Sequence, residues 1–362
     1  MALQDYQPPD FTAPALASAP DARFSAVETD GVLPEGFFST SNLPTYVKVA
    51  GRWQLPTRPR MDCAIVRRGA ALEVIEPRRL HAGDIVAMGS LEDGAAGILV
   101  HTEGFLGGAH SPNEFRFMST EISRERPSNY EELVQRLLEE RAQGGYLIWV
   151  AGPALVHSRA RRDFQWFIEQ GFVQAMLAGN AVAVHDIEAA IYGTTLGMTS
   201  TGRPTDGGHG LHMRAINMVR AAGSIEAAVA SGLVKDGIMH SLVTHDIPFV
   251  LAGSIRDDGP LPGVYSDVLE AQDAMREHTV RATGALLLAS ALHAIAVGNM
   301  LPAYHTNHGG VPSPLMTSCV DQTEFVVNKL RDRGTHQAFG VVTNAQDFMH
   351  VLRSYLEKAN GR

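Results

Sequence analysis

Cysteine and lysine are both scarce in this 362-residue chain. Cys63 and Cys319 stand far apart, so a disulfide framework is not expected, and a reducing, cytoplasmic setting is the natural expectation. The lysines are Lys48, Lys235, Lys329 and Lys358. The last two fall in an expected amphipathic helix and in the C-terminal tail, which argues against a Schiff-base lysine there, while Lys48 and Lys235 remain open.

Motifs that define several enzyme classes are also absent. The chain has no P-loop, no GxSxG nucleophile elbow and no CxxC pair, so nucleotide hydrolysis and acyl transfer lose support. Two histidine pairs, His209 with His212 and His305 with His308, lie in glycine-containing loops without a helical glutamate beside them. Metal sites need a tighter ligand pattern than this, so no metal is expected.

Long apolar runs and a surplus of positive charge are missing as well. The most apolar segment, 283–297, is interrupted by His293 and is too short to cross a bilayer. The first twenty residues lack a basic stretch followed by an apolar one, so no secretory signal is expected. A net charge of −9 gives no basic face for nucleic acid or an anionic membrane. The expected partners are therefore small molecules.

The composition and the hydrophobic pattern indicate a globular protein with two regions of different secondary structure. Hydrophobic residues make up 45% and charged residues 19%, as in ordinary folded domains. We expect a loose arm over 1–23 and a β-rich substrate-side domain over 24–127, with short strands at 46–49, 63–66 and 85–88. From 128 to 362, apolar runs alternate with amphipathic helices. That alternation predicts an α/β domain with a doubly wound parallel sheet.

The expected elements of this larger domain are specific enough to compare with a structure. Strands are predicted at 146–151, 175–178, 249–252, 317–320 and 339–342. Helices are predicted at 128–141, 159–170, around His185, and at 211–222, 224–233, 236–245, 264–281, 283–297, 322–333 and 345–358. The stretch 304–314, rich in glycine, proline and histidine, is interpreted as a loop.

Four of the predicted strands release similar polar or glycine-containing turns. These are Gly152-Pro153, Gly179-Asn180, Gly253-Ser254 and Asp321. Glycine lets backbone N–H groups approach a phosphate, and a following helix N-terminus favours negative charge, so the turns indicate a nucleotide site. The alternative is that the glycines serve tight turns, because the usual GxGxxG fingerprint is absent. Asp321 fits ribose hydroxyls and fits a helix N-cap equally well.

Two further places carry ionisable side chains in suggestive positions. The strand 249–252 runs into a loop with Arg256, Asp257 and Asp258, either an active-site loop at the carboxyl edge of the sheet or a solvated charged turn. In the β-rich domain, Asp62 precedes Cys63 at a strand start. This is either an acid/base pair or an ordinary strand boundary, and the boundary is the commoner case.

Several segments in order resemble one known family. They are 33–42 (LPEGFFSTSN), 61–66 (MDCAIV), 178–188 (AGNAVAVHDIE), 248–263 and 293–299 (HAIAVGN). Together they resemble the lysine-oxoglutarate reductase/saccharopine dehydrogenase bifunctional-enzyme domain family, and within it the archaeal-type ornithine cyclodeaminases and the C-terminal part of the cyanobacterial arginine dihydrolase/ornithine cyclodeaminases. The resemblance covers about residues 24–353. It includes no dihydrolase domain, and 304–314 departs from the pattern.

The resemblance implies an NAD-binding fold like that of deoxyhypusine synthase and a redox-neutral reaction. Bound NAD⁺ takes a hydride from the Cα of ornithine, the δ-amine attacks that carbon, ammonia leaves, and the returned hydride gives proline. Catalytic roles are expected for Asp257, Asp258 and Asp62. Substrate contacts are expected from Arg256, Asn42, Thr45 and Cys63. NAD contacts are expected from Gly152, Pro153, Gly179, Asn180, His185, Asp186, Gly253, Ser254, Ile255, Asn299 and Asp321.

Two other functions remain open from the sequence. One is an NAD(P)-dependent amino-acid or opine oxidoreductase with net redox on another small basic amino acid, and the other is a non-catalytic dinucleotide-binding sensor. A substrate panel followed at the nicotinamide absorbance separates a cyclodeaminase from the oxidoreductase, because a cyclodeaminase makes product without net NADH. A sensor would bind NAD and turn over no substrate. A homo-oligomer is expected in either enzymatic case.

Overall fold

The chain forms two compact units in the computed structural model. The structure describes residues 6–105, 130–157, 159–199, 201–257, 259–288, 290–306, 310–322 and 338–360. The first unit comprises Met1–Arg124, Gly298–Leu315 and Leu330–Gln337, and the second comprises Glu125–Val297, Met316–Lys329 and Ala338–Arg362. Each unit is therefore discontinuous in sequence, whereas the sequence predicts a single boundary between residues 127 and 128.

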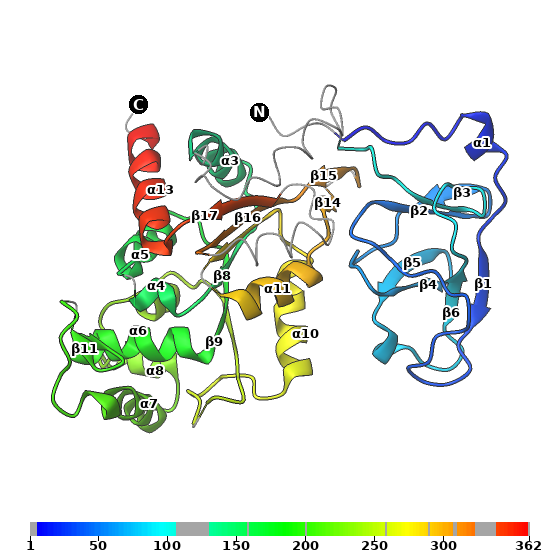
Figure 1. The fold of residues 1–362 in the computed structure, drawn as a ribbon. Coiled ribbons are helices and arrows are strands. Elements are labelled where there is room, and N and C mark those ends of the chain that lie inside the picture. The colour runs from blue at the N-terminus through cyan, green and yellow to red at the C-terminus, as the bar shows by residue number, and fades with distance from the viewer. Residues whose placement is uncertain are drawn as a thin grey trace. The chain divides into compact units, whose positions relative to one another are not determined.

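The first unit is built from short antiparallel strands (Figure 1). A four-stranded sheet has the order β1-β6-β4-β5 and a three-stranded sheet the order β3-β2-β7. The elements are α1 (Pro14–Ala17), β1 (Arg23–Ala26), β2 (Thr45–Val49), β3 (Arg52–Gln54), β4 (Ala64–Arg68), β5 (Ala71–Ile75), a 3₁₀ turn (Pro77–Arg79), β6 (Ile85–Met88) and β7 (Ile98–Val100). The predicted strands at 46–49, 63–66 and 85–88 are confirmed as β2, β4 and β6.

The second unit contains a six-stranded parallel sheet. Its strands are β8 (Leu147–Ala151), β9 (Ala175–Gly179), β12 (Phe249–Ala252), β13 (Gly284–Leu288), β16 (Met316–Asp321) and β17 (Ala338–Val342). The order across the sheet is β12-β9-β8-β13-β16-β17, and every neighbouring pair is parallel. The chain winds outward from β8 to β12, then returns to β13 and winds outward on the other side. The predicted doubly wound sheet is confirmed, in the strand order of the Rossmann fold.

Helices and a small hairpin precede, connect and follow these strands (Figure 1). They are α3 (Tyr130–Ala142), α4 (Ala154–His157), α5 (Arg161–Glu169), α6 (Asn180–Tyr192), the hairpin β10 (Thr194–Thr195) and β11 (Met198–Thr199), a 3₁₀ turn (Gly208–Gly210), α7 (Leu211–Ala222), α8 (Ile225–Ala230), α9 (Ile238–Thr244), α10 (Val268–Thr279), α11 (Ala291–Met300) and α13 (Ala345–Asn360). Helices of this kind after parallel strands give right-handed crossovers.

An aromatic cluster on β8 anchors the core of the second unit. Trp149 is fully buried, and its ring lies 5.2 Å from that of Phe164 and 5.0 Å from that of Phe167. The indole Nε1 donates a 2.8 Å hydrogen bond to the carbonyl of Phe172, so the one polar atom of this side chain is satisfied inside the core. Helix α5 is thereby fixed against the sheet.

The predicted helix over 283–297 is wrong for its first half. Residues Gly284–Leu288 form β13, and a helix begins only at Ala291. All five residues of β13 are buried, because the strand lies between β8 and β16 in the middle of the sheet. Leucine and alanine favour helices in isolation, but a place between two parallel strands overrides that preference.

Two more predictions differ from the structure or lie outside it. The stretch interpreted as a loop contains a hairpin of β14 (Tyr304–Thr306) and β15 (Pro312–Pro314) in the first unit. The predicted helix 264–281 begins only at Val268, because the Asp267 side chain accepts hydrogen bonds from the amides of Leu269 and Glu270 and caps it there. The predicted helix 322–333 lies largely outside the described residues.

Candidate functional site

The carboxyl edge of the parallel sheet gathers the turns that the sequence singles out. β8 ends at Ala151, β9 at Gly179, β12 at Ala252 and β16 at Asp321. The strand order reverses between β8 and β13, and the Gly152 amide donates a 2.8 Å hydrogen bond to the carbonyl of Leu288 at that point. Open α/β sheets bind ligands beside the carboxyl ends of their strands at such a reversal. Gly152 and Pro153 lie at this crevice.

The N-terminus of α6 faces this edge without a side-chain cap. Gly179 is its N-cap residue in an extended conformation, and within the described part of the chain no side chain caps the first turn. The Asn180 side chain points elsewhere, because its Oδ1 accepts a 3.1 Å hydrogen bond from the Leu261 amide. The first amides of a 13-residue helix are therefore left to an anionic group, the arrangement by which helix N-termini bind phosphate.

His293 lies over Gly179 and was not among the predicted site residues. A Cβ atom added to Gly179 would come within 2.7 Å of the His293 ring, so the imidazole in its present position packs directly on this glycine. His293 Nδ1 lies 3.0 Å from the Ser290 hydroxyl, and burial lowers the pKa of the ring below its ordinary value. The side chain is thus a neutral imidazole held at the edge. Only its position on α11, directly after β13, reveals it, and the sequence prediction misplaced β13.

Asp321 lines a cavity of about 160 Å³ at the same edge. The other walls come from Ala154 on α4 and from Thr343, Asn344 and Ala345 at the start of α13. Asn344 caps α13 by accepting a 2.8 Å hydrogen bond from the Gln346 amide. A carboxylate in such a cavity is suited to accept hydrogen bonds from ribose hydroxyls.

The loop after β12 is held by its own polar groups. The Asp257 carboxylate accepts a 2.7 Å hydrogen bond from the Ser254 amide, and the Ser254 hydroxyl accepts one of 3.1 Å from the Arg256 amide. Gly253 is bonded at 2.7 Å to the Tyr265 carbonyl. Ile255 and Arg256 project into solvent. Asp258 lies outside the described residues.

His185 and Asp186 make contacts inside the protein. Asp186 is 0% exposed, and its carboxylate accepts hydrogen bonds from Arg161 Nε at 2.5 Å and from the amides of Ile238 and Met239 at 2.9 and 2.8 Å. His185 Nδ1 lies 3.6 Å from the Glu188 carboxylate. These contacts join α6 to α5 and α9 and give Asp186 a structural role, while the cofactor contacts of His185 and Asp186 stay predictions.

The predicted residues of the first unit are mostly packed into its core. Cys63 is 2% exposed within an apolar cluster, and its backbone pairs with Thr40. Thr45 donates to the Leu43 carbonyl at 3.1 Å and lines a cavity of about 10 Å³, room for one water molecule. Asn42 is also buried, and its backbone carbonyl accepts a hydrogen bond from the Ala303 amide.

Asp62 is exposed and has a φ of +57°, in the left-handed region. Asp62 lies in the turn just before β4, so its geometry is that of a strand boundary. Asn299 lies near the end of α11, within the Gly298–Leu315 part of the first unit.

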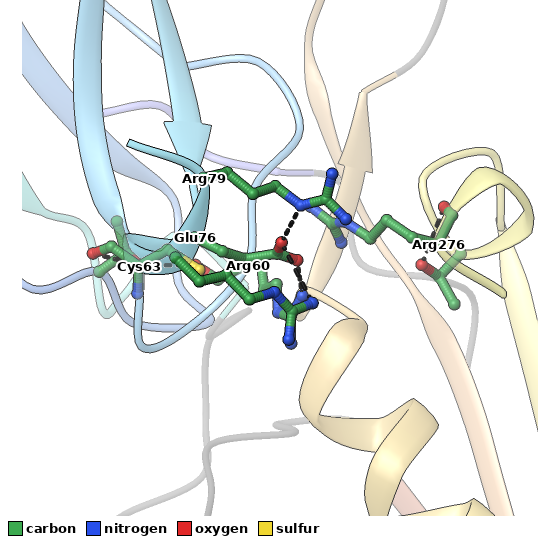
Figure 2. Close-up of polar contacts among 8 residues, drawn as sticks. Arg60, Cys63, Glu76, Arg79 and Arg276 are labelled. Atoms are coloured by element: carbon green, nitrogen blue, oxygen red, sulfur yellow. Dashed lines mark hydrogen bonds and ion pairs between the residues drawn. The ribbon is translucent and has the colours of Figure 1, made fainter. Parts of the chain in front are cut away.

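A carboxylate surrounded by arginines also lies in the first unit. Figure 2 shows Glu76 bound to Arg60 and Arg79, and Arg78 lies 3.4 Å from the same carboxylate. Burial by itself would raise the pKa of Glu76, but the hydrogen bond from Arg79 and the charges of the three arginines outweigh it and lower the pKa. The cluster fixes the turn after β5.

Metals and membranes find no support in the part of the chain that the structure describes. Within it, no group of three or more histidine, cysteine, aspartate or glutamate side chains is arranged to hold a metal ion. None of the described helices combines the length and the apolar character needed to span a bilayer.

The fold and the edge together define an α/β protein of the Rossmann class with a nucleotide-type ligand edge. Comparison with known families agrees with this class. Residues 131–352 match the model "Arginine dihydrolase ArgZ-like, C-terminal, Rossmann fold", and residues 44–131 match "Arginine dihydrolase ArgZ-like, C-terminal, first region". The chain belongs to this ArgZ-like C-terminal family, which confirms the predicted resemblance.

Individual relatives of known name or structure agree with this family assignment. The chain is 41% identical over 347 residues to an ornithine cyclodeaminase of Methanopyrus kandleri, which covers 93% of this chain and 79% of the relative. A crystal structure of a conserved LOR/SDH protein from Methanococcus maripaludis S2 is 38% identical, with a TM-score of 0.85, covering 94% of this chain and 99% of that one. A ternary complex of AgrE with ornithine and NAD⁺ is 35% identical, with a TM-score of 0.59, covering 95% of this chain and 47% of that one.

Proposed function

We propose that this protein is an NAD-dependent ornithine cyclodeaminase, converting L-ornithine to L-proline and ammonia. The observation that carries the proposal is the 41% identity to an archaeal ornithine cyclodeaminase over 93% of the chain. The related AgrE complex holds both ornithine and NAD⁺, which supports the substrate and the cofactor together. We assign the cofactor contacts of this chain to the carboxyl edge of the parallel sheet.

The residues at the sheet edge fit a dinucleotide. The uncapped N-terminus of α6 suits the pyrophosphate, and glycines 152, 179 and 253 let backbone approach it closely. Asp321, in its cavity beside α13, would accept hydrogen bonds from a ribose. When bound, NAD supplies a reversible hydride acceptor. The cofactor contacts of His185 and Asp186 stay predictions, as do those of Ser254 and Ile255 at the outer rim of this site.

His293 is our candidate for moving protons. Its ring is uncharged at neutral pH because burial lowers its pKa, so it can accept a proton from an amine. Ser290 holds Nδ1 at 3.0 Å, and no partner of Nε2 is recorded among the described residues. One nitrogen would thus orient the ring and the other would face the reactants.

Arg256 and Asp257 complete the proposed chemistry of the unit. Arg256 is exposed on a loop that Ser254 and Asp257 hold in shape, so its guanidinium is available for the substrate carboxylate. Asp257 would orient the loop in addition to its predicted catalytic role. The proposed roles of Asp258, Asp62, Asn42, Thr45 and Cys63 rest on the family resemblance alone.

The reaction releases ammonia without net oxidation, which places the enzyme among the ammonia lyases. We also propose that it acts in proline formation from ornithine, in a reducing cytoplasm, as a homo-oligomer. Static light scattering of the purified protein measures the oligomeric state.

Mass spectrometry of the purified protein and of its products tests the function. We expect NAD to co-purify and ornithine to yield proline with no change in nicotinamide absorbance. An absorbance rise in step with product would instead indicate an oxidoreductase with net redox. NAD binding without any turnover of a panel of basic amino acids would indicate a sensor.

A further inference from the structure

A second cavity in the Rossmann unit, of about 750 Å³, lies away from the carboxyl edge. Its walls come from the end of α4, the start of α5, the C-terminal part of α6 and the hairpin β10–β11. The wall on α6 begins at Ala189, nine residues beyond Asn180, which is about 14 Å of helix rise from the proposed cofactor edge. The volume is within the range of small-molecule sites.

The cavity carries a surplus of positive charge. Arg159, Arg161 and Arg162 all line it, against the single carboxylate of Asp236. The Arg161 guanidinium forms ion pairs with Asp186 at 2.5 Å and with Asp236 at 2.7 Å, so its charge is neutralised inside the protein. Among the described residues, no carboxylate lies within ion-pair distance of Arg159 or Arg162. Asp236 also interacts electrostatically with Arg162, but its carboxylate is bonded to Arg161. The guanidinium groups of Arg159 and Arg162 are therefore placed to bind an oxyanion, for which their planar fork is well suited.

The hairpin wall is fixed in place before any ligand arrives. Glu188 is fully buried and accepts hydrogen bonds from the Thr194 hydroxyl at 3.0 Å and from the amides of Leu196 and Gly197 at 3.0 and 2.8 Å. One carboxylate on α6 thus holds the turn of the hairpin. The hydroxyls of Thr195 and Thr199 are presented on the same wall. A wall fixed in this way lowers the entropy cost of binding.

Two non-glycine residues on the rim hold left-handed backbone. Arg159 has a φ of +70° and Leu196 a φ of +52°. Such conformations cost free energy and persist where the surrounding structure needs a side chain in one place. At Arg159 the conformation places a guanidinium at the cavity, and at Leu196 it presents a side chain that is 54% exposed.

We propose that this cavity binds a small organic oxyanion, whose phosphate or carboxylate is held by Arg159 and Arg162. The body of the ligand would contact the threonine hydroxyls and the apolar side chains of Leu196 and Met198, which is 38% exposed. The site is separate from the proposed ornithine and NAD site, so it stands or falls independently of that function.

Calorimetric titration of the NAD-saturated protein tests the proposal, because NAD fills the cofactor edge. The probes are ribose 5-phosphate and 2-oxoglutarate. We expect at least one to bind, and Arg159→Gly with Arg162→Gln to weaken that binding by about tenfold or more. Glycine suits the left-handed backbone at 159, and both arginines are exposed, so folding is retained.

Arg214→Gln, on the exposed face of α7 and outside the cavity, is the matched control and should bind as the wild type does. Binding of ribose 5-phosphate alone identifies the ligand as a phosphate compound, and binding of 2-oxoglutarate alone identifies it as a carboxylate. Binding of neither, or binding unchanged in the double variant, overturns the proposal.

Discussion

At the residue scale, the polar side chains at the sheet edge divide into those that bond neighbouring elements together and those that lie beside a cavity or over the end of a strand. The oxygens of Asp186 accept three hydrogen bonds inside the protein, and the Asn180 Oδ1 accepts one from Leu261. Asp321 lines a cavity, and among the described residues the ring of His293 has Ser290 as its hydrogen-bond partner, at Nδ1. The candidates for chemistry are therefore Asp321 and His293, and the first two residues hold the site in shape.

Asp321→Asn should weaken NAD binding without disturbing the fold. An amide keeps the size of the side chain but loses one charged acceptor for the ribose, and a hydrogen bond of that kind corresponds to about a tenfold rise in Kd. Fluorescence titration of the protein with NADH measures the change. Asp206→Asn, in an exposed loop, is the control. Equal affinity in both variants would remove Asp321 from the cofactor site.

His293→Gln should lower kcat by about a hundredfold or more if the imidazole moves a proton. The acid limb of the wild-type pH profile should then lie below the ordinary histidine pKa, because burial lowers the pKa of His293. Steady-state rates from pH 5 to 9 check both points. Exposed His209, changed to Gln, should leave the profile unchanged. A wild-type rate in His293→Gln would contradict this role.

The same pKa shift affects stability in a defined direction. With its folded-state pKa lowered, His293 binds a proton more weakly in the folded protein than in the unfolded chain. The free energy of unfolding should therefore fall as the pH drops below about 6.5. His293→Gln should make this decline shallower, and urea titrations at several pH values measure it. Other histidines whose pKa is lowered by partial burial, such as His157 and His278, contribute to the remaining slope.

At the element scale, Asp186 joins three helices. Its carboxylate binds Arg161 at the start of α5 and the first amides of α9, while its backbone belongs to α6. An acidic side chain at a helix N-terminus is favourable, and here it also replaces the missing side-chain cap of α9. The helical layer beside the sheet depends on this one buried group.

Asp186→Asn should destabilise the protein by about 3 kcal/mol, because it removes a fully buried charge that partners Arg161, whose side chain is 13% exposed. The other partner of Arg161 is Asp236, and the Asp236 side chain is 57% exposed. Asp236→Asn should therefore lower the free energy of unfolding by less than about 1 kcal/mol. Urea unfolding followed by circular dichroism compares the two. Similar losses in both variants would show that burial does not set the energy of this network.

The elements that the sequence predicted correctly are those with local signals. Ser224 is a capping residue in sequence and accepts from the Ala227 amide in the structure, and the glycines after strands sit at the sheet edge as expected. β13 could not be identified in this way, because Gly284–Leu288 (GALLL) has no β-branched or aromatic residue and its strand character comes from β8 and β16 on either side. Because β13 was predicted as helix, the sequence also did not predict that His293 lies at the carboxyl edge of the sheet.

At the scale of the whole molecule, the discontinuous units explain why domain boundaries are hard to predict. Gly298–Leu315 leaves α11 and contributes β14 and β15 to the first unit before the chain returns as β16. Tyr304 in that segment is 1% exposed and clusters with Tyr6 and Tyr46. The composition of this segment does not predict that the chain passes back to the first unit, because the segment has the glycine and proline content of an ordinary loop.

Nitrogen labelling tests the central claim most directly. In the proposed reaction the α-nitrogen of ornithine leaves as ammonia and the δ-nitrogen stays in the ring, with no net NADH. The purified holoenzyme with [α-¹⁵N]ornithine should therefore release labelled ammonia and form unlabelled proline in equal amounts. Labelled proline, or NADH accumulating in proportion to product, would contradict the assignment as a redox-neutral ornithine cyclodeaminase.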